Sequence, residues 1–307
     1  MRALDKFHVP LVVLGVLVLT VVIGSLFYLF EQMRASATDT RGDPVLVGAG
    51  DISDCRNDND EATAKLLDGI KGTVFTAGDN VYTRGTYAEY KECYDPTWGR
   101  HKARTKPAPG NHGYRTEGAS GYFNYFGAAA GDPSKGYYSY DLGEWHVVVL
   151  NSMCEEVGGC EDSSPQIGWL RQDLASNQRA CTLAIWHHPL FSSGGEHGSD
   201  PKMKAAWDAL YAANAELVLN GHDHDYERFA PQSPSADPEP TKGIREFVVG
   251  TGGGSLDGLG TRKANSEVFN DDTYGVLKLT LHPGSYDWEF VPEAGKSFTD
   301  SGTTDCH

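Results

Sequence analysis

The sequence predicts an α/β fold in which short buried strands alternate with amphipathic helices. Short apolar runs that end in Gly, Asp, Asn or His predict the strands, and capped apolar stripes between several of them predict the helices. The chain has 307 residues, 39% of them hydrophobic, and is long enough to bury a full core. Ligands of such folds bind at the carboxyl ends of strands, so we expect the functional residues directly after the apolar runs.

The expected strands are short apolar runs without the alternation of a half-exposed strand, as is typical of strands buried on both faces. They cover residues 45–52, 73–79, 105–111, 146–152, 182–188, 216–220 and 246–250. Residues 275–292 contain two further runs on either side of Pro283 and Gly284, a pattern that predicts a hairpin.

Three helices are expected from their capping residues. They begin at Asn59 or Asp60, at Ser164 with Pro165, and at Asp200 with Pro201. The first continues through Leu67 and stops at Gly69. In the other two, apolar residues form one face, namely Ile167, Leu170 and Leu174 in the second helix and Met203, Trp207, Leu210 and Tyr211 in the third.

The N-terminal segment predicts export. Residues 9–30 carry no charge, and at ~1.5 Å per residue they extend about 33 Å, enough to cross the hydrocarbon core of a bilayer. We therefore expect a signal anchor or transmembrane segment at residues 1–30 and a polar tether at residues 31–44. The remaining chain is then held at the cell membrane, outside the cytoplasm.

A cleaved signal peptide is the alternative to this anchor. Arg2 and Lys6 form a basic start, and Ala35-Ser36-Ala37 resembles a cleavage site. Against cleavage, the apolar run is longer than the usual signal core of about 7–15 residues. Cleavage near Ala37 would release the domain as a secreted protein.

Six cysteines follow this segment, as expected for disulfide bonds in an exported domain. They are Cys55, Cys93, Cys154, Cys160, Cys181 and Cys306. Cys154 and Cys160 flank a Gly158-Gly159 turn and form the easiest local pair. Among the possible connectivities of the other four, one hypothesis joins Cys55 to Cys93 and Cys181 to Cys306, which would tie the tail at residues 293–307 to the domain. No C-x-x-C pair is present, which disfavours a thiolate zinc site.

The charge of the chain narrows the class of partner. It contains 26 Lys and Arg against 42 Asp and Glu, a formal net charge of −16. Proteins that bind nucleic acids present a basic face to the phosphate backbone. We therefore expect no nucleic-acid partner.

Polar side chains follow five of the expected strands. In chain order the motifs are Gly50-Asp51, Gly78-Asp79-Asn80-Val81-Tyr82, Gly110-Asn111-His112, His187-His188-Pro189 and Gly221-His222-Asp223-His224. Each has an ordinary alternative, because Gly-Asp is usually a turn and a single histidine is often a hydrogen-bonded core residue. As a set they offer oxygen and imidazole ligands at every strand end, a mixture that suits borderline divalent or trivalent metals better than calcium.

This ordered set resembles the calcineurin-like metallophosphoesterases and, within them, the purple acid phosphatases, as an exported bacterial member of that branch. The family pattern is G-D-x, G-D-x-x-Y, G-N-H-(D/E), H-x-P and G-H-x-H, and the resemblance covers residues 45–292. Tyr82, three residues after Asp79, marks the purple branch. The resemblance implies a four-layer sandwich, in which two mixed β-sheets are flanked by helices, as one catalytic domain with a dinuclear metal centre.

The resemblance also implies the metal ligands. One metal would take Asp51, Asp79, Tyr82 and His224, and the second would take Asn111, His187 and His222 together with the bridging Asp79. The tyrosine implies a ferric ion, with iron, zinc or manganese as the second metal. Two such cations clamp the phosphoryl oxygens and lower the pKa of a bound water.

Two further histidines are implied as catalytic residues. His112 corresponds to the family histidine that contacts substrate, although Gly113 stands where the family has an acidic residue. His197 resembles the general acid of small purple phosphatases, at a spacing from His187 that is one residue longer. Asp223 and Asp225 are expected to support the histidines or to cap a loop. His188 either faces the substrate or is structural.

The function implied by the resemblance is an exported phosphatase that hydrolyses phosphomonoesters by attack of a metal-activated hydroxide. Its partner would be a small phosphate ester. One alternative is a phosphodiesterase that acts on nucleotides or lipid headgroups. Another is a non-catalytic envelope protein that binds metal or a partner, which would predict an eroded ligand set, whereas all seven implied ligands are present.

Overall fold

The computed structural model describes residues 42–307. The expected signal anchor at residues 1–30, the cleavage-like site near Ala37 and most of the tether lie outside the described residues. Within residues 42–307, no helix combines the length and the apolar character that a membrane crossing needs.

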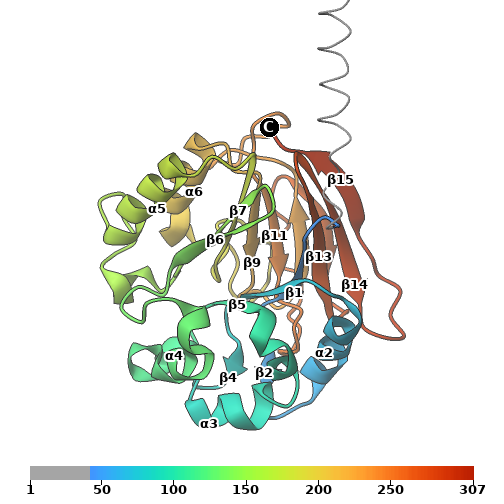
Figure 1. The fold of residues 1–307 in the computed structure, drawn as a ribbon. Coiled ribbons are helices and arrows are strands. Elements are labelled where there is room, and N and C mark those ends of the chain that lie inside the picture. Colours follow the sequence, from blue (N-terminus) through green and yellow to red (C-terminus); the bar gives the residue numbers. More distant parts are fainter. Residues whose placement is uncertain (1–41) are drawn as a thin grey trace, which may run out of the picture. The chain divides into compact units, whose positions relative to one another are not determined.

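Two mixed β-sheets form the centre of the fold, and helices lie against them (Figure 1). The six-stranded sheet contains, in order, β15 (Ser301–Asp305), β14 (Ser285–Pro292), β13 (Gly275–His282), β1 (Val45–Ala49), β3 (Thr73–Ala77) and β5 (Thr105–Ala108). The seven-stranded sheet contains β12 (Ser266–Asn270), β10 (Tyr226–Phe229), β11 (Arg245–Val249), β9 (Leu217–Asn220), β8 (Cys181–Ile185), β7 (Trp145–Val149) and β6 (Tyr138–Leu142). A small third sheet pairs β2 (Ser53–Asp54) with β4 (Val81–Tyr82).

Five α-helices are described. They are α2 (Asn59–Gly69), α3 (Tyr87–Glu89), α4 (Ser120–Phe126), α5 (Pro165–Ser176) and α6 (Lys204–Ala212). Shorter helical segments lie at Tyr90–Tyr94, Trp98–Arg104, Gly113–Arg115, Glu117–Ala119, Gly127–Ala130, Cys154–Val157 and Pro201–Met203. In Figure 1, α5 and α6 lie beside the seven-stranded sheet, whereas α2, α3 and α4 gather with β2 and β4 at one end of the sheets.

Alternate residues of the central strands pack into two different cores, because successive side chains of a strand point to opposite faces. Val147 and Val149 of β7 belong to the core shared with the six-stranded sheet. Val148 packs instead with Leu170 of α5 and Trp207 of α6. On the six-stranded sheet, α2 packs against β13. The predicted arrangement of two sheets flanked by helices is therefore confirmed.

All seven expected strands are present, and most end earlier than expected. The strand expected at residues 45–52 ends at Ala49, and the strand expected at residues 73–79 ends at Ala77. The residues that follow include Asp51 and Asp79, whose φ angles are +59° and +39°. A left-handed residue cannot continue an extended strand, so the polar residues lie in loops.

The predicted hairpin and two of the three helix starts are confirmed. β13 pairs with β14 up to His282 and Ser285, which leaves Pro283 and Gly284 as the turn. Ser164 caps α5 by accepting the N–H of Ile167. The third helix begins with a short turn at Pro201–Met203 before α6.

The predicted cap of the first helix is wrong. Asp58 occupies the capping position of α2 and makes no side-chain capping bond. Asp60 is buried and accepts hydrogen bonds from Ser53 Oγ (2.5 Å) and Thr97 Oγ1 (2.6 Å). Its carboxylate therefore joins β2 to a more distant segment instead of serving its own helix.

Several elements were not expected from the sequence, among them α3, α4, β6, β10 and β12. Within residues 293–307, expected as a tail, β15 pairs antiparallel with β14 and completes the edge of the six-stranded sheet. The residues of β15 are small or polar, so this strand lacks the apolar pattern from which strands were expected.

All three hypothesised disulfide bonds are present. They join Cys55 to Cys93, Cys154 to Cys160 and Cys181 to Cys306. No cysteine of the described residues is free. The last bond links β8 of one sheet to the residue after β15 of the other sheet.

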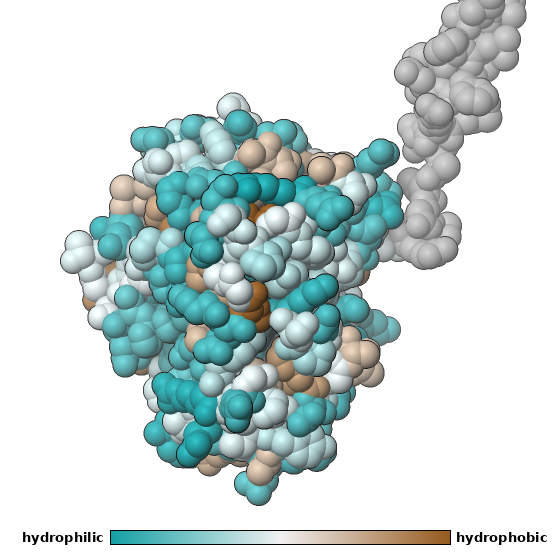
Figure 2. All heavy atoms as spheres, turned by 90° about the vertical axis from the view of Figure 1, so that its left-hand side faces the viewer, coloured by the Kyte–Doolittle hydropathy of each residue, from teal (hydrophilic) through white to brown (hydrophobic). Residues whose placement is uncertain are grey.

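The molecular surface is largely polar on the face shown in Figure 2, with small apolar patches between hydrophilic residues. Among the described residues, the exposed large hydrophobic side chains are Tyr87 and Leu259. Isolated exposed apolar residues of this kind are ordinary for a folded domain.

Candidate metal centre

The ends of parallel strands from both sheets bring the expected site residues together. Asp51, Asp79 and Asn111 follow β1, β3 and β5, and His187 and His222 follow β8 and β9. A cavity of about 290 Å³ lies at this point. Its lining includes Asp79, Tyr82, Asn111, His112, His197, His222 and His224. The two remaining expected residues, Asp51 and His187, are fully buried beneath it.

One group of contacts joins Asp51, Tyr82 and His224. Tyr82 Oη donates a hydrogen bond to Asp51 Oδ1 (2.7 Å) and lies 2.9 Å from His224 Nε2. The same His224 nitrogen lies 3.4 Å from Asp51 Oδ1. These are three of the four ligands expected for the first metal.

A second group surrounds the inner nitrogen of His187. His187 Nε2 lies 3.2 Å from Asp79 Oδ2, 3.0 Å from Asn111 Oδ1 and 3.3 Å from His222 Nδ1. It also lies 4.0 Å from Asp51 Oδ1, so the two groups are adjacent. One ligand atom each from Asp51, Asp79 and His187 lies within 4.8 Å of the others, a spacing that a shared metal centre requires.

Backbone carbonyls hold three of the histidines in one orientation. His187 Nδ1 lies 2.8 Å from the carbonyl of Ala77, and His224 Nδ1 lies 2.6 Å from that of Ser255. His112 Nδ1 lies 2.7 Å from the carbonyl of Thr83. When the ring is neutral, an N–H donated to each carbonyl leaves the other ring nitrogen as a lone pair on the side of the site. Histidines that bind metals are oriented in this way.

The backbone is strained at three of the expected ligands. Asp51, Asp79 and His222 have φ angles of +59°, +39° and +77°. Residues other than glycine rarely adopt a positive φ, which costs about 1–3 kcal/mol per residue, and such strain clusters at functional sites. The strained residues all follow strands and all turn a side chain toward the same centre.

The glycine before several expected ligands makes room for a ligand from another motif. A Cβ atom on Gly78 would lie 2.4 Å from His187 Nδ1, and one on Gly110 would lie 2.2 Å from Asp79 Oδ1. A Cβ atom on Gly221 would lie 2.4 Å from Asp51 Oδ2. The glycines of the sequence motifs are therefore explained by close packing between motifs.

Burial and the neighbouring carboxylates shift the pKa values of two histidines in opposite directions. Burial lowers the pKa of His187, but Asp79 and Asp51 outweigh it and raise this pKa to about 9. Burial also lowers the pKa of His224, but the hydrogen bond to Asp51 and the charges of Asp51 and Asp257 raise it to about 10. Without a cation, protons on these histidines balance the carboxylates.

Two other expected ligands, His222 and Tyr82, stay neutral. Burial, followed by the neighbouring His187, lowers the pKa of His222 far below its usual range. Burial and the charge of Asp51 raise the pKa of the Tyr82 phenol well above its usual range. Carboxylate, amide, phenol and imidazole donors around two adjacent points fit a pair of transition-metal cations, which would replace the protons.

The two expected catalytic histidines lie at the cavity. The ring of His112 meets that of Tyr82 edge-on, 4.4 Å between centroids, and its Nε2 lies 3.9 Å from Asp79 Oδ2. Burial lowers the pKa of His112, although Asp79 opposes it. The ring of His197 is exposed and stacks on that of His222, 4.1 Å between centroids.

Other residues named in the sequence analysis have structural contacts. His188 is buried, and its Nδ1 lies 2.7 Å from Ser152 Oγ. Its ring also contacts that of His222, so His188 supports an expected ligand from behind the cavity. Asp223 binds the loop that carries His197. Both carboxyl oxygens of Asp225 are buried without a hydrogen-bond partner among the described residues.

Five charged residues of the cavity lining were not expected from the sequence. They are Asp54, Arg56, Arg115, Glu196 and Asp257. Arg56 forms an ion pair with the buried Asp54, from Nη2 to Oδ2 at 2.5 Å. Asp54, Arg115 and Glu196 lie within three residues of expected site residues, and this closeness is the only signal that the sequence offered for them. Asp257 comes from a loop after β11, and no local pattern pointed to it.

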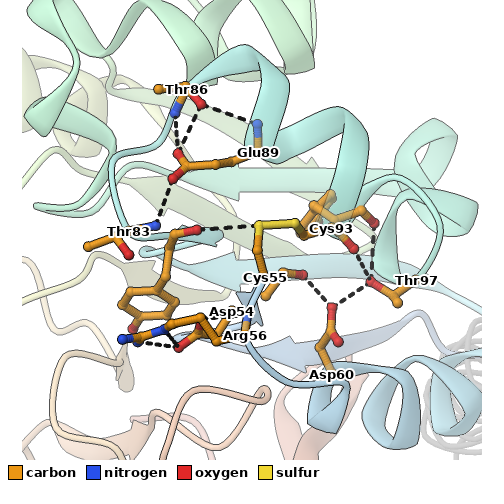
Figure 3. The surroundings of a disulfide bond; sticks show 12 residues. Asp54, Cys55, Arg56, Asp60, Thr83, Thr86, Glu89, Cys93 and Thr97 are labelled. Carbon is orange, nitrogen blue, oxygen red and sulfur yellow. Dashed lines mark hydrogen bonds and ion pairs between the residues drawn. A yellow bond between two sulfur atoms is a disulfide. The ribbon is translucent and has the colours of Figure 1, made fainter.

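Figure 3 shows the disulfide bond between Cys55 and Cys93 beside the segment that contains Thr83 and Thr86. Cys55 follows β2, which pairs with the strand containing Tyr82, and Cys55 is bonded to Cys93. The carboxylate of Glu89 accepts the backbone N–H groups of Thr83 (2.9 Å) and Thr86 (2.8 Å). The Tyr82 loop is therefore held from both sides.

Comparison with known proteins gives a consistent result. A family model described as calcineurin-like phosphoesterase matches residues 42–226. Purple acid phosphatase 21 of Arabidopsis thaliana is 34% identical over 158 residues, which are 48% of this chain and 34% of that protein. Acid phosphatase A of Cryphonectria parasitica is 26% identical over 194 residues, 54% of this chain and 38% of that protein. The chain thus spans little more than a third of the length of these relatives.

Two solved structures share the fold. The purple acid phosphatase PPD1 from yellow lupin (Lupinus luteus) seeds has a TM-score of 0.68 at 19% identity, covering 85% of this chain and 53% of that one. GAP50, the anchor in the inner membrane complex of Plasmodium, has a TM-score of 0.66 at 14% identity, covering 87% and 90%. At these identities the likeness concerns the fold alone.

Gly110→Ala tests the steric explanation of the glycines. The added Cβ would also lie 2.3 Å from the backbone nitrogen of Asp79, so Asp79 has to move. We expect metal affinity, measured by competition with a chelator, to fall by about 10–100-fold, as for other changes around metal ligands. Gly168→Ala in α5 is the matched control, because nothing lies within 4 Å of its added Cβ. Equal affinities of the two variants would contradict the explanation.

The raised histidine pKa values predict how the stability of the metal-free protein depends on pH. An unfolded histidine has a pKa of about 6.5. The folded protein holds protons on His187 and His224 up to pKa values of about 9 and about 10. The free energy of unfolding should therefore fall as the pH rises from about 7 to 10. Urea unfolding of chelator-treated protein at pH 7 and 9 measures this, and an unchanged midpoint would contradict it.

Proposed function

Because the chain belongs to the calcineurin-like phosphoesterase family, we propose that it hydrolyses phosphomonoesters at a dinuclear metal centre, as an acid phosphatase-like enzyme. The observation that carries this proposal is the pair of adjacent donor groups around Asp51 and His187 beneath one open cavity. The purple acid phosphatases among its relatives support the same reaction class.

The expected ligands divide into two sets. Asp51, Tyr82 and His224 would hold one cation, and Asn111, His187 and His222 the other, with Asp79 between them. We propose a ferric ion in the first set, because it contains the phenol, and iron, zinc or manganese in the second. When bound, the two cations would supply positive charge for the phosphoryl oxygens and a water of lowered pKa.

The protein's own residues would bind the ester and move protons. His112 lines the cavity, and its Nε2, a lone pair while Nδ1–H donates to Thr83, would accept a hydrogen bond from the hydroxyl of a singly protonated phosphomonoester. His197 is exposed at the rim, where it would give a proton to the leaving oxygen as its bond to phosphorus breaks. A cavity of about 290 Å³ is at the small end of ligand sites, which favours a small ester as substrate.

Turnover of p-nitrophenyl phosphate against bis(p-nitrophenyl) phosphate tests the proposal. We expect purified full-length protein to prefer the monoester, and Asp79→Ala to lose metal from both positions and turnover together. Preference for the diester would replace the proposal with a phosphodiesterase. Stoichiometric metal with turnover of neither ester would support a non-catalytic role instead.

We also propose that the domain lies outside the cytoplasm, held to the membrane by residues 1–30. Three disulfide bonds in the described residues and the charge-free run at residues 9–30 support this. Protease added to intact cells should digest the domain while a cytoplasmic marker survives. Protection of the domain until the cells are lysed would contradict the proposed location.

A further inference from the structure

One buried carboxylate beside the cavity belongs to a residue outside the expected ligand and catalytic sets. Asp223 is fully buried between the expected ligands His222 and His224. We propose that Asp223 is a positioning residue that holds His197 in place for proton transfer to the leaving oxygen. This inference rests on the proposed function, and in it Asp223 contributes to the reaction only through His197.

The carboxylate of Asp223 accepts hydrogen bonds from one short loop. Its Oδ2 accepts the hydroxyl of Ser192 (2.5 Å) and the backbone N–H of Gly198 (3.0 Å). Its Oδ1 accepts the backbone N–H groups of His197 (3.2 Å) and Gly198 (3.1 Å). A carboxylate surrounded by N–H and O–H donors forms charge-assisted hydrogen bonds, which are roughly twice as strong as neutral ones.

The loop requires such an anchor because of its composition. Residues 194–198 read Gly-Gly-Glu-His-Gly, and glycine loses more conformational freedom on folding than any other residue. A Cβ atom on Gly194 would lie 2.2 Å from Asp223 Cγ, so this glycine lets the loop wrap closely around the carboxylate. The loop is adapted to Asp223 as well as bound by it.

Two backbone hydrogen bonds also hold this loop, but they do not involve the residues that Asp223 binds. The N–H of Gly195 bonds the carbonyl of Gly258 (2.9 Å), and the N–H of Gly260 bonds that of Ser193 (2.8 Å). These bonds join the loop to residues 258–260 but leave the N–H groups of His197 and Gly198 to Asp223. The backbone at the histidine itself is therefore held by the carboxylate.

The result is a fixed relation between two histidines. His222 comes directly before Asp223, and the ring of His197 stacks on the ring of His222 at 4.1 Å with 21° between their planes. One dipeptide after β9 therefore supplies an expected metal ligand and the anchor of the proton donor. The position of the proton donor is therefore fixed relative to the metal centre.

Leaving-group chemistry makes this role measurable. The oxygen of a water that has lost one proton to the solvent forms the new bond to phosphorus, and the old bond breaks with its electron pair on the leaving oxygen. His197 gives that oxygen a proton and regains one from the solvent. An alcohol needs this proton far more than p-nitrophenol, whose anion is stable by itself. A displaced His197 should therefore harm the hydrolysis of alkyl esters selectively.

Steady-state kinetics of full-length Asp223→Asn on glycerol phosphate and p-nitrophenyl phosphate test the proposal. The amide keeps the size of the side chain but cannot accept all four hydrogen bonds. We expect metal content to be retained and kcat for glycerol phosphate to fall by about 10–100-fold, less than the ~10²–10⁴-fold that general acid catalysis contributes, because His197 is displaced and not removed. For p-nitrophenyl phosphate we expect a fall of less than about 3-fold, with KM little changed for both esters, since binding by the metals and His112 does not need the proton.

Three further variants make the result decisive. Ser192→Ala removes one donor away from the ligand strand, and it should show the same selectivity, smaller in size, even where Asp223→Asn fails to fold or to bind metal. In a His197→Ala background, Asp223→Asn should cause no further loss, because both act through one proton. Asp173→Asn is the matched control, since Asp173 also accepts a serine hydroxyl and lies near a histidine, but far from the cavity, and it should leave both rates unchanged.

Two outcomes would overturn the proposal. One is an equal loss of turnover on both esters by Asp223→Asn and Ser192→Ala, which is what a general structural role produces. The other is a full additional loss in the His197→Ala background. If the unmodified protein turns over neither ester, the proposed phosphatase function fails, and this inference fails with it.

Discussion

Burial of charged groups at the meeting point of two sets of parallel strands is the constraint on which the site depends. Asp51, Asp79 and His187 lie almost wholly out of water, and one ligand atom of each lies within 4.8 Å of the others. Ionised groups in such positions cost several kcal/mol each unless opposite charge compensates them. Protons on His187 and His224 provide that charge in the metal-free protein. The geometry of the donors fits cations in their place, so that folding and metal binding draw on the same residues.

Local sequence around the site follows from this crowding. The strained backbone at Asp51, Asp79 and His222 turns each side chain inward immediately after a strand. Glycines before the ligands leave space that any Cβ atom would fill. The cost of the strain is offset elsewhere, by the two apolar cores on either side of the seven-stranded sheet and by the disulfide bonds. Removing one ligand therefore does more than remove one bond, because it also leaves the neighbouring charges uncompensated.

The site divides into a rigid floor and a rim of loops. Strand ends form the floor, whereas the rim contains His112, His197, Glu196, Arg115 and Asp257 from several loops. Loops on a rigid scaffold commonly carry the residues that distinguish one substrate from another. Asp223 connects the two parts, because it belongs to the floor by its place in the chain and to the rim by its hydrogen bonds.

The sequence by itself determined the fold class, the seven expected strands and the expected ligand set, because strand periodicity and strand-end motifs are local patterns. It missed β15, because the small and polar residues of this edge strand form no apolar pattern, and it missed the cap of α2, because Asp60 binds Thr97, 37 residues away. It also could not find Asp257 in the cavity or give the purpose of the motif glycines. Only the tertiary structure decided these points, because each depends on contacts between separate segments of the chain. Gly110 and Asp79 lie 31 positions apart, and Gly221 and Asp51 lie 170 positions apart.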